Sequence, residues 1–390
     1  MDITGIICEY NPLHLGHKKQ IDSIRKAYPD GGIVCLMSGN YVQRGSPAIL
    51  DKMQRAKAAV LSGADLVLEL PVTAALSSAE GFASSGVQIL SGICNRLCFG
   101  TESADPESLW SVARALLTPE FSCALKETLA KGVSFPVGRQ QALRELGVCA
   151  DILSLPNNIL AVEYCKAILV QGSSMEIMPI CRHGNYHDTL PNAENPSATA
   201  LRELLLAKKN WQDYVPEEVK DIYQKAPLHS IAFGEQAILS RLRTMTDDEF
   251  ETLPYGSEGL WRKLMHASRK FATLEEIISN VKSKRYTRTR IDRMVLCAFL
   301  GITQEIITTP APYVRVLGLN DKGREILKRF RAKGDFPNIG ETQDSQYQLL
   351  ENRWGDLYGL FGENPEAPGA EQQYRIYYKK HSENAKSLGK

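Results

Sequence analysis

The sequence predicts an α/β fold in which a parallel sheet is covered by helices and followed by a mostly helical C-terminal region. In the first half, short and almost continuously apolar runs alternate with segments of helical periodicity, which is typical of parallel strands buried on both faces. Beyond the middle of the chain this alternation fades: residues 215–305 have mainly helical periodicity, and 312–380 are mixed. We therefore expect two regions, 1–210 and 211–390, with the boundary between residues 205 and 230.

Five segments of the first region have the composition of buried strands, each short, apolar and followed by polar residues or glycine. They are 6–8, 33–37, 66–68, 97–99 and 176–180. The segments between them place apolar residues at helical spacing, as Ile21, Ile24 and Ala27 do after the first strand. Helices are expected at 18–27, 51–62, 79–91, 158–171 and from 197 onward, and 105–150 is expected to form a mostly helical insertion over the site.

Polar residues follow each predicted strand. Ligands of open parallel sheets bind beyond the carboxyl ends of the strands, so these residues are the first candidates for a site. They are Glu9 to His17, Ser38 to Gly45, Glu69, and Gly100 to Glu102.

The motif His14-Leu15-Gly16-His17 lies where the first strand should turn into the first helix. The first amide groups of a helix lack intrahelical partners and carry partial positive charge, which favours an anion such as a nucleotide phosphate. Two imidazoles three residues apart fall on the same side of the first turn, and Gly16 allows a ligand to approach the backbone. A zinc site is the weaker interpretation, because helical metal pairs usually stand four residues apart with a carboxylate.

A second motif, Ser197-Ala198-Thr199-Ala200-Leu201-Arg202, follows the fifth predicted strand. Ser197 and Thr199 can cap the incoming helix and donate hydroxyls to phosphate oxygens, and Arg202 on the first turn can reach a leaving pyrophosphate. Taken alone, the motif is better explained as an ordinary helix cap with a surface arginine. Together the two motifs resemble the Rossmann-like nucleotidylyltransferase superfamily, whose members cleave a nucleoside triphosphate between its α- and β-phosphates. The resemblance implies catalytic roles for His14, His17 and Arg202.

Bulk composition excludes several classes of protein. The net charge of +1 gives no overall attraction to nucleic acid, so any RNA-binding surface must be local. The nine cysteines are scattered without framework spacing and no signal peptide is visible, which favours free thiols in a cytoplasmic protein. No apolar run approaches the ~20 residues that span a bilayer. Cys181, His183 and His187, or Cys94 and Cys98, could suggest zinc, but neither group has a matching second pair, so we expect no bound metal.

Six blocks, in order, resemble the bacterial tRNA(Met) cytidine acetate ligase family more closely. They are Glu9–His17, Met37–Gly45, Gly63–Pro71, Phe99–Glu102, Leu155–Leu160 and Arg182–Gly184. The resemblance is dense up to about residue 205 and looser beyond it. It implies that acetate attacks ATP to give acetyl-adenylate and pyrophosphate, and that N4 of the wobble cytidine of elongator tRNA(Met) then takes the acetyl group.

The resemblance also implies the ligands and their contacts. ATP is expected to carry Mg²⁺ on its triphosphate, since no Asp-rich metal motif is visible. The positions that match the family's ATP contacts, together with Ser197 and Thr199, are Ile7, Cys8, Glu9, Tyr10, Asn11, Pro12, Leu13, His14, Leu15, Gly16, His17, Lys18, Lys19, Gln20, Gly100, Asn157 and Arg182. The acetate pocket is not identified, although Tyr41, Gln43 and Arg44 could supply donors to a small anion.

A tRNA substrate requires a basic surface. The clearest patch contains six cations with only Asp292 opposing them nearby in the sequence: Lys282, Lys284, Arg285, Arg288, Arg290 and Arg293. Such a run is often only a solvated face, but a tRNA substrate favours phosphate contacts.

Two other functions remain open. The first is a plain adenylyltransferase acting on a small metabolite, and the second is a non-catalytic RNA-binding protein with a relic nucleotide fold. The sequence indicates no oligomeric state.

Overall fold

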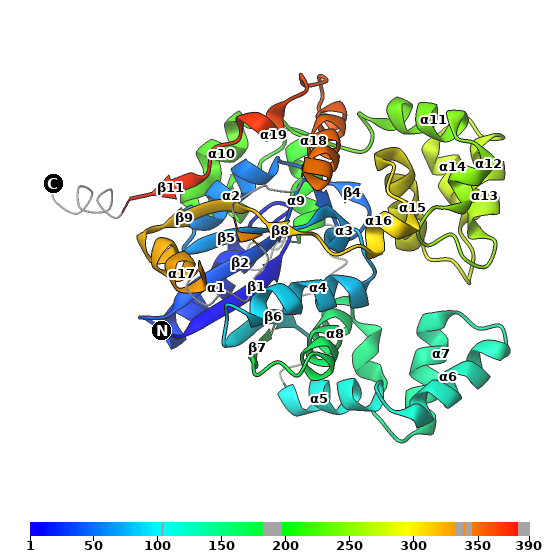
Figure 1. Ribbon diagram of the computed structural model, residues 1–390, viewed down its shortest axis with the longest axis horizontal. Helices are drawn as coiled ribbons and strands as arrows, with labels where there is room; N and C mark the ends of the chain where they lie inside the picture. The colour runs from blue at the N-terminus through cyan, green and yellow to red at the C-terminus, as the bar shows by residue number, and fades with distance from the viewer. Residues whose placement is uncertain (103–104, 182–196, 332–337, 340–344, 381–390) are drawn as a thin grey trace.

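The structure, a computed structural model, describes residues 1–102, 105–181, 197–331, 338–339 and 345–380. Within these residues a seven-stranded sheet has the order β11-β9-β5-β2-β1-β6-β7 (Figure 1). Its strands are β1 (Ile3–Cys8), β2 (Gly32–Ser38), β5 (Leu66–Leu70), β6 (Arg96–Thr101), β7 (Glu176–Cys181), β9 (Val316–Asn320) and β11 (Tyr377–Lys379). The five strands of the first region are all parallel, which confirms the predicted fold class.

Apolar side chains alternate between the two faces of this sheet. In β1, Ile3 and Ile7 join the core on one face, whereas Ile6 and Cys8 join the core on the other. Both faces are therefore covered, which explains why each strand is almost continuously apolar.

The helices of the first region cover these two faces. α1 and α2 lie on one face, and α4, α5 and α8 pack together on the other. The pair α6 and α7 extends away from the sheet (Figure 1). Their bounds are α1 (Leu15–Ala27), α2 (Lys52–Leu61), α3 (Val72–Ala75), α4 (Ala79–Ser91), α5 (Pro106–Ala115), α6 (Pro119–Ala130), α7 (Phe135–Glu145), α8 (Pro156–Val170) and α9 (Ala198–Leu206).

The segment after α9 is helical, as predicted; its helices from α11 onward contribute to one core, and α10 packs in a smaller one. Its helices are α10 (Lys220–Lys225), α11 (Glu235–Thr244), α12 (Asp247–Glu251), α13 (Leu260–Ser268), α14 (Leu274–Val281), α15 (Arg288–Leu300) and α16 (Gln304–Thr308). The larger core also includes Tyr41, Val72 and Leu76 from the first region, so the helical segment packs directly against that region.

The last part of the chain returns to the sheet, which the sequence did not predict. β9 pairs antiparallel with β5, and β11 pairs parallel with β9. Leu317 of β9 joins the core of the first region, so β9 covers an edge of β5 that would otherwise expose unpaired backbone groups. The sheet therefore contains strands from both sides of the predicted boundary near residue 210. The remaining elements are β8 (Tyr313–Val314), α17 (Asp321–Arg331), β10 (Asn338–Ile339), α18 (Ser345–Tyr358) and α19 (Ala370–Gln373).

A short antiparallel hairpin follows β2. It consists of β3 (Tyr41–Val42) and β4 (Ser46–Pro47) and lies beyond the carboxyl end of the sheet strand. No helix in the described ranges is both long and apolar enough to cross a membrane.

Candidate active site

The two histidines of the first motif cap the helix that they begin. His14 is the N-cap of α1, and its Nδ1 accepts a hydrogen bond from the Gly16 amide at 3.1 Å. The Nδ1 of His17 accepts from the His14 amide at 3.3 Å, so two imidazoles form a capping box. The rings stack with centroids 3.8 Å apart, on the same side of the first turn as the spacing predicts.

This capping changes the expected chemistry of the helix end. The sequence suggested unpartnered amides at the start of α1, but the amides of His14 and Gly16 donate to imidazole nitrogens. Because Nδ1 of each ring is an acceptor, the proton of each neutral ring is on Nε2. A donor role of these Nε2–H groups toward phosphate oxygens stays a prediction, and the His14 side chain is buried, with 1% of its surface exposed.

The loop between β1 and α1 is tightly held. Tyr10 is buried at a φ of +44°, a left-handed conformation that is strained for a tyrosine. Its ring meets the His17 ring edge-on at 5.0 Å, and burial raises the pKa of its phenol well above the ordinary value. Asn11 accepts a hydrogen bond from the Ile49 amide at 2.8 Å, and Glu9 accepts one from the Gln43 amide at 2.8 Å.

Several predicted ATP-contact residues face the protein core. The side chains of Ile7, Cys8 and Leu13 belong to the two cores beside the sheet, so only their backbone atoms are available to a ligand. Lys18 pairs with Asp22 one turn along α1, and Lys19 is exposed. ATP contacts along Ile7–Gln20 stay a prediction, with the histidines as the side chains best placed for phosphate.

Arg55 on α2 was not singled out from the sequence. Its side chain is completely buried and donates to the carbonyls of Glu9 at 2.6 Å and Ser38 at 3.0 Å, and also to that of Gly39. It thereby joins the loops that follow β1 and β2. Burial lowers the pKa of this guanidinium from its ordinary value. An arginine within a helical pattern normally predicts a solvent-facing side chain, so the sequence held no signal for this role.

The second motif lies against the first. Ser197 is the N-cap of α9, and its hydroxyl accepts from the Ala200 amide at 3.1 Å. Arg202 donates to the carbonyl of Asn11 at 2.8 Å and to the hydroxyl of Thr199 at 3.0 Å. The fold thus brings the second motif against the loop that leads into the first, and the two contacting residues are 191 positions apart in the chain.

The end of β6 and the start of α8 form the opposite side of the site. Glu102 accepts from the side-chain amide of Asn157 at 2.6 Å and from the backbone amide of Asn158 at 2.9 Å. Asn158 in turn accepts from the Thr101 hydroxyl at 2.6 Å. Gly100 is half-buried beside them in β6. Glu102 therefore sets the orientation of Asn157, for which a nucleotide contact stays a prediction. Arg182, His183 and His187 lie outside the described residues.

The residues considered for acetate have different surroundings. The Tyr41 side chain is buried, and its hydroxyl donates to the carbonyl of Trp354 at 2.7 Å, so it is engaged in the core. The Gln43 backbone lies between Glu9, to which it donates, and Arg293, from which its carbonyl accepts at 3.3 Å. Arg44 is exposed at the hairpin tip.

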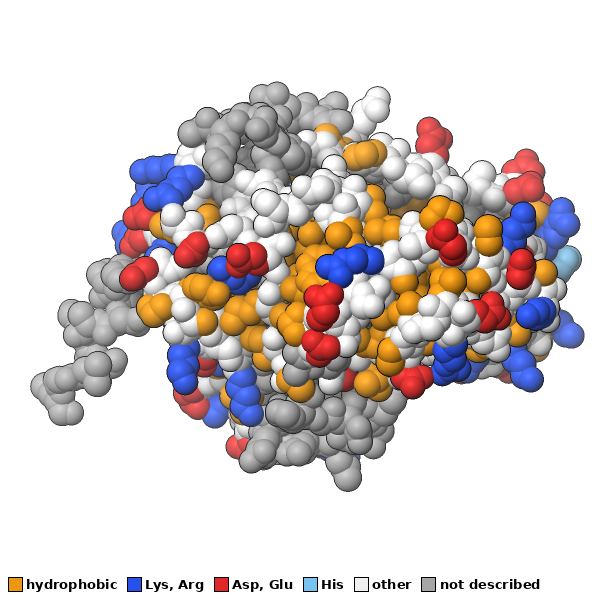
Figure 2. Space-filling view, turned by 90° about the horizontal axis from the view of Figure 1, so that it is seen from below, with side chains coloured by type: hydrophobic (Ala, Val, Ile, Leu, Met, Phe, Trp, Pro, Cys, Tyr) orange, Lys and Arg blue, Asp and Glu red, His pale blue; other side chains and the backbone are white. Residues whose placement is uncertain are grey.

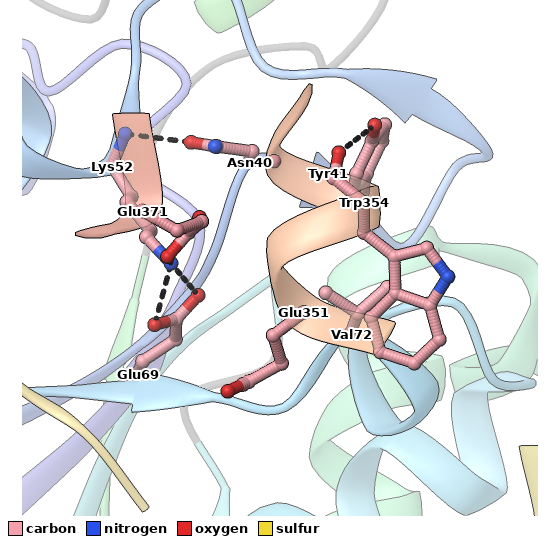
Figure 3. Close-up of a pocket in the computed structure, with 9 residues that line it drawn as sticks. Asn40, Tyr41, Lys52, Glu69, Val72, Glu351, Trp354 and Glu371 are labelled. Atoms are coloured by element: carbon pink, nitrogen blue, oxygen red, sulfur yellow. Dashed lines mark hydrogen bonds and ion pairs between the residues drawn. The ribbon is translucent and has the colours of Figure 1, made fainter. Parts of the chain in front are cut away.

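A buried ionic cluster lies at the carboxyl ends of β2 and β5, and sequence reasoning identified only Glu69 of it. Lys52 donates to both carboxylate oxygens of Glu69 at 2.9 Å and to Glu371 at 2.8 Å (Figure 3). Arg315 pairs with Glu371 at 2.6 Å and with Glu351 at 2.7 Å. The adjoining cavity of about 10 Å³ has room for one water molecule, which is too little for acetate.

The charges in this cluster shift one another's pKa values. Burial alone would lower the pKa of the Lys52 ammonium, but Glu69 and Glu371 raise it above the ordinary value. Burial and the neighbouring Glu69 raise the pKa of Glu351 to about 7. The cluster therefore takes up a proton near neutral pH.

The predicted RNA-binding patch has more internal partners than the sequence indicated. Arg285 pairs with Glu258 at 2.7 Å, and Arg288 pairs with Glu275 at 2.7 Å as well as with Asp292 at 3.0 Å. Arg290 donates to the Tyr255 carbonyl at 2.8 Å. The expectation that only Asp292 opposes this patch is therefore wrong, because the fold brings glutamates from other segments to it.

The six residues of that patch also differ in exposure. Arg293 is only 8% exposed and bonds to the Gln43 carbonyl, so it faces the hairpin and not the solvent. Lys282 and Lys284 are exposed. RNA contact stays a prediction for the exposed members.

The cysteines and histidines were the metal ligands that the sequence offered. All nine cysteines are free thiols, and Cys94 and Cys98 are buried. Across the described ranges, no group of three or more His, Cys, Asp or Glu side chains is arranged to hold a metal ion.

Comparisons with known proteins agree with this geometry. The sequence model of the family described as HIGH nucleotidyl transferase matches residues 1–373. A protein of Clostridium novyi named tRNA(Met) cytidine acetate ligase is 41% identical over 357 residues, which cover 86% of this chain and 89% of the relative. A protein of Acetivibrio thermocellus with the same name is 33% identical over 413 residues, which cover 96% of this chain and 98% of the relative.

Solved structures extend the comparison to the whole fold. The crystal structure of apo Thermotoga maritima TmcAL superposes with a TM-score of 0.87 at 31% identity, covering 97% of this chain and 100% of that one. A second form, bound with alpha-thio ATP, gives a TM-score of 0.87 at 30% identity with the same coverage. The chain therefore belongs to the tRNA(Met) cytidine acetate ligase family of HIGH nucleotidyl transferases.

Proposed function

We propose that this chain is an ATP-dependent ligase that activates acetate as acetyl-adenylate and acetylates N4 of the wobble cytidine of elongator tRNA(Met). The observation that carries the proposal is the contact of Arg202 with the Asn11 carbonyl, which joins the second motif to the loop that leads into the first. Support also comes from relatives of this name that match over most of the chain. The nine free thiols and a tRNA substrate both fit a reducing cytoplasm.

In the first step, an acetate oxygen attacks the α-phosphorus of ATP and the bond to the β-phosphate oxygen breaks. Pyrophosphate leaves, and negative charge builds on the phosphoryl oxygens. We assign the donors for this charge to the Nε2–H groups of His14 and His17 and to the N-terminus of α1, and the neutralisation of pyrophosphate to Arg202. Alignment of the two reactants supplies much of the remaining acceleration.

Mg²⁺ is expected to bind through the triphosphate itself. In the part of the chain that the structure describes, no group of three or more carboxylate, imidazole or thiol side chains is arranged to hold the ion. When bound, the ion neutralises phosphate charge and favours departure of pyrophosphate.

In the second step, the exocyclic N4 amine attacks the acetyl carbonyl, the bond to the AMP oxygen breaks, and the amine loses a proton to AMP or solvent. The lone pair of this amine is conjugated into the cytosine ring, so the amine is a poor nucleophile. An acyl donor with a good leaving group is therefore required, and acetyl-adenylate provides it. The tRNA, acetate and ATP are the three substrates.

The test is an ATP–pyrophosphate exchange assay with acetate, followed by mass spectrometry of elongator tRNA(Met) for N4-acetylcytidine. We expect exchange that depends on acetate and a modified wobble base in the second assay. His17→Ala should abolish exchange, since loss of one such donor typically reduces turnover about 100- to 1,000-fold.

Other outcomes would assign a different function. AMP transfer to a metabolite, without acetate-dependent exchange, would identify a plain adenylyltransferase. Binding of tRNA without any ATP turnover would identify a non-catalytic RNA-binding protein.

A further inference from the structure

α13 carries a row of cations that the sequence patch did not include. Arg262, Lys263, His266, Arg269 and Lys270 are exposed, whereas Leu260, Leu264 and Met265 face the core. The exposed residues recur about once per helical turn, or every ~5.4 Å, along one side of α13 and its C-terminal extension. No Asp or Glu occurs between residues 259 and 274. We name these five residues the α13 face.

The α13 face keeps most of its charge available. Within the described ranges, Arg269 pairs with Asp247 at 2.6 Å, but no carboxylate lies within 4.0 Å of Arg262, Lys263 or Lys270. By contrast, Arg285, Arg288 and Arg290 of the sequence patch all have acidic or carbonyl partners within the protein. A cation already paired inside the protein must give up that partner before it can bind phosphate, so the α13 face is the better phosphate-binding surface.

Aromatic rings accompany these cations and connect the two basic segments. The Arg262 guanidinium lies 4.8 Å from the Trp261 ring, and the Lys263 ammonium lies 5.3 Å from the Tyr286 ring. Arg290 lies 5.4 Å from the same tyrosine ring. Tyr286 therefore lies between Lys263 of the α13 face and Arg290 of the sequence patch, and it follows the exposed Lys282 and Lys284 closely in the chain. Figure 2 shows Lys and Arg side chains, with Asp and Glu among them, at the end of the molecule where Figure 1 places α13 together with α6 and α7.

The surface is also fixed relative to the site. Arg293 of α15 bonds to the Gln43 carbonyl, and the Gln43 amide bonds to Glu9 in the loop before His14. On the other side, the Tyr255 hydroxyl donates to the Leu76 carbonyl at 2.7 Å. A polyanion held on α13 is thus held at a set distance from the nucleotide loop.

We propose that the α13 face, with Lys282 and Lys284, binds the phosphate backbone of the RNA substrate and sets how the anticodon reaches the site. This inference rests on the proposed function, because it assigns the surface to that tRNA. Its charge complements a nucleic-acid backbone, and its cations carry no sequence information by themselves. It therefore supplies affinity and orientation, and base recognition belongs to other residues.

The experiment compares the double variant Arg262→Glu/Lys263→Glu with a matched control, Lys328→Glu/Arg329→Glu. The control residues are exposed on α17, which Figure 1 places at the other end of the molecule. Both variants change the net charge equally. We expect the α13 variant to raise the KM for tRNA at least about tenfold and to reduce the slope of log affinity against log salt by about two. The control should behave as the unmodified protein.

Acetate-dependent ATP–pyrophosphate exchange without tRNA separates this inference from the proposed function. Exchange should be unchanged in both variants. If the unmodified protein itself showed no exchange, that result would contradict the proposed function but would leave the proposed RNA-binding surface untouched. An unchanged KM and salt slope in the α13 variant would overturn the inference. So would a loss of exchange in that variant alone.

A milder variant and a second probe keep the test decisive. Should the glutamate variant fold poorly, Arg262→Gln/Lys263→Gln must still lower the salt slope. Binding to vesicles of phosphatidylglycerol and phosphatidylcholine tests whether the α13 face binds a lipid membrane and not RNA. Loss of vesicle binding with an unchanged tRNA KM would overturn the proposal in favour of a membrane partner.

Discussion

At the scale of single residues, the two histidines of the first motif have two separable tasks. Nδ1 of His14 caps α1, whereas Nε2 is the nitrogen to which the proposed mechanism assigns the donor role. Asparagine can place an acceptor where Nδ1 stands and is itself a favoured N-cap residue, but it has no group at the position of Nε2. A single substitution can therefore remove the donor and keep the cap.

We expect His14→Asn to leave the thermal midpoint within a few degrees of the unmodified protein while exchange falls about 100- to 1,000-fold. Differential scanning fluorimetry and the exchange assay measure the two effects. His14→Ala is the matched control, and it should lose both the cap and the activity. Exchange within tenfold of the unmodified value in His14→Asn would show that Nε2 is not a donor in the reaction.

Residues that the sequence could not assign share one property, namely that non-local contacts define their roles. Arg55 is a cation in a helix, and such a residue is normally solvent-facing, yet here it is buried beneath two loops. Glu258 and Glu275 oppose the basic patch only because the chain folds back on itself. Local patterns identified His14, Ser197 and Arg202, since these lie at the junctions of predicted strands and helices.

At the scale of elements, a glycine allows the hairpin β3–β4 to approach the backbone of α15 closely. Gly45 has a φ of +81°, and a Cβ at this position would lie 2.4 Å from the Arg293 amide nitrogen. Gly132, after α6, has a similar φ of +79° but nothing within 4 Å of a Cβ. The pair therefore separates the effect of backbone strain from the effect of a steric clash.

We expect Gly132→Ala to lower the free energy of unfolding by about 1–2 kcal/mol, from strain alone. Gly45→Ala adds overpacking between two backbones and should cost about 1–3 kcal/mol more. Urea titrations followed by tryptophan fluorescence measure both. Equal losses in the two variants would mean that the hairpin does not need its close approach to α15.

The sequence predicted some strands of the sheet and missed others. The five parallel strands of the first region were found because each is a continuous apolar run bounded by helices. β9 and β11 were missed because they have only five and three residues and their partners are not neighbours in an alternating pattern. β9 pairs with β5, about 250 residues earlier in the chain, and β11 pairs with β9. Short strands without such surroundings lack a local signal.

At the scale of the whole molecule, the buried ionic cluster joins the two ends of the chain. Lys52 and Glu69 come from the first region, whereas Arg315, Glu351 and Glu371 come from the last segment. If all five side chains were ionised, the cluster would carry one excess negative charge. Burial of an uncompensated charge is unfavourable, so a proton on Glu351 neutralises the cluster.

This arrangement predicts how stability depends on pH. The pKa of Glu351 rises from an ordinary 4.5 to about 7 in the folded state, so the folded protein holds this proton more tightly than the unfolded chain. The contribution to stability is full below about pH 4.5 and is lost as the pH rises through 7. The slope reaches at most about 1.4 kcal/mol per pH unit. His229 acts in the opposite direction, because burial lowers its pKa from 6.5 to about 4.

Glu351→Gln isolates the first effect, since glutamine keeps an oxygen for Arg315 and Tyr313 and cannot ionise. Relative to this variant, the unmodified protein should lose stability steadily between pH 5 and 8, with the His229 contribution cancelling between the two. Urea unfolding across this range measures the difference. Parallel curves for the two proteins would mean that Glu351 stays ionised when buried. The cluster would then join the two ends of the chain through its ion pairs alone, independently of pH.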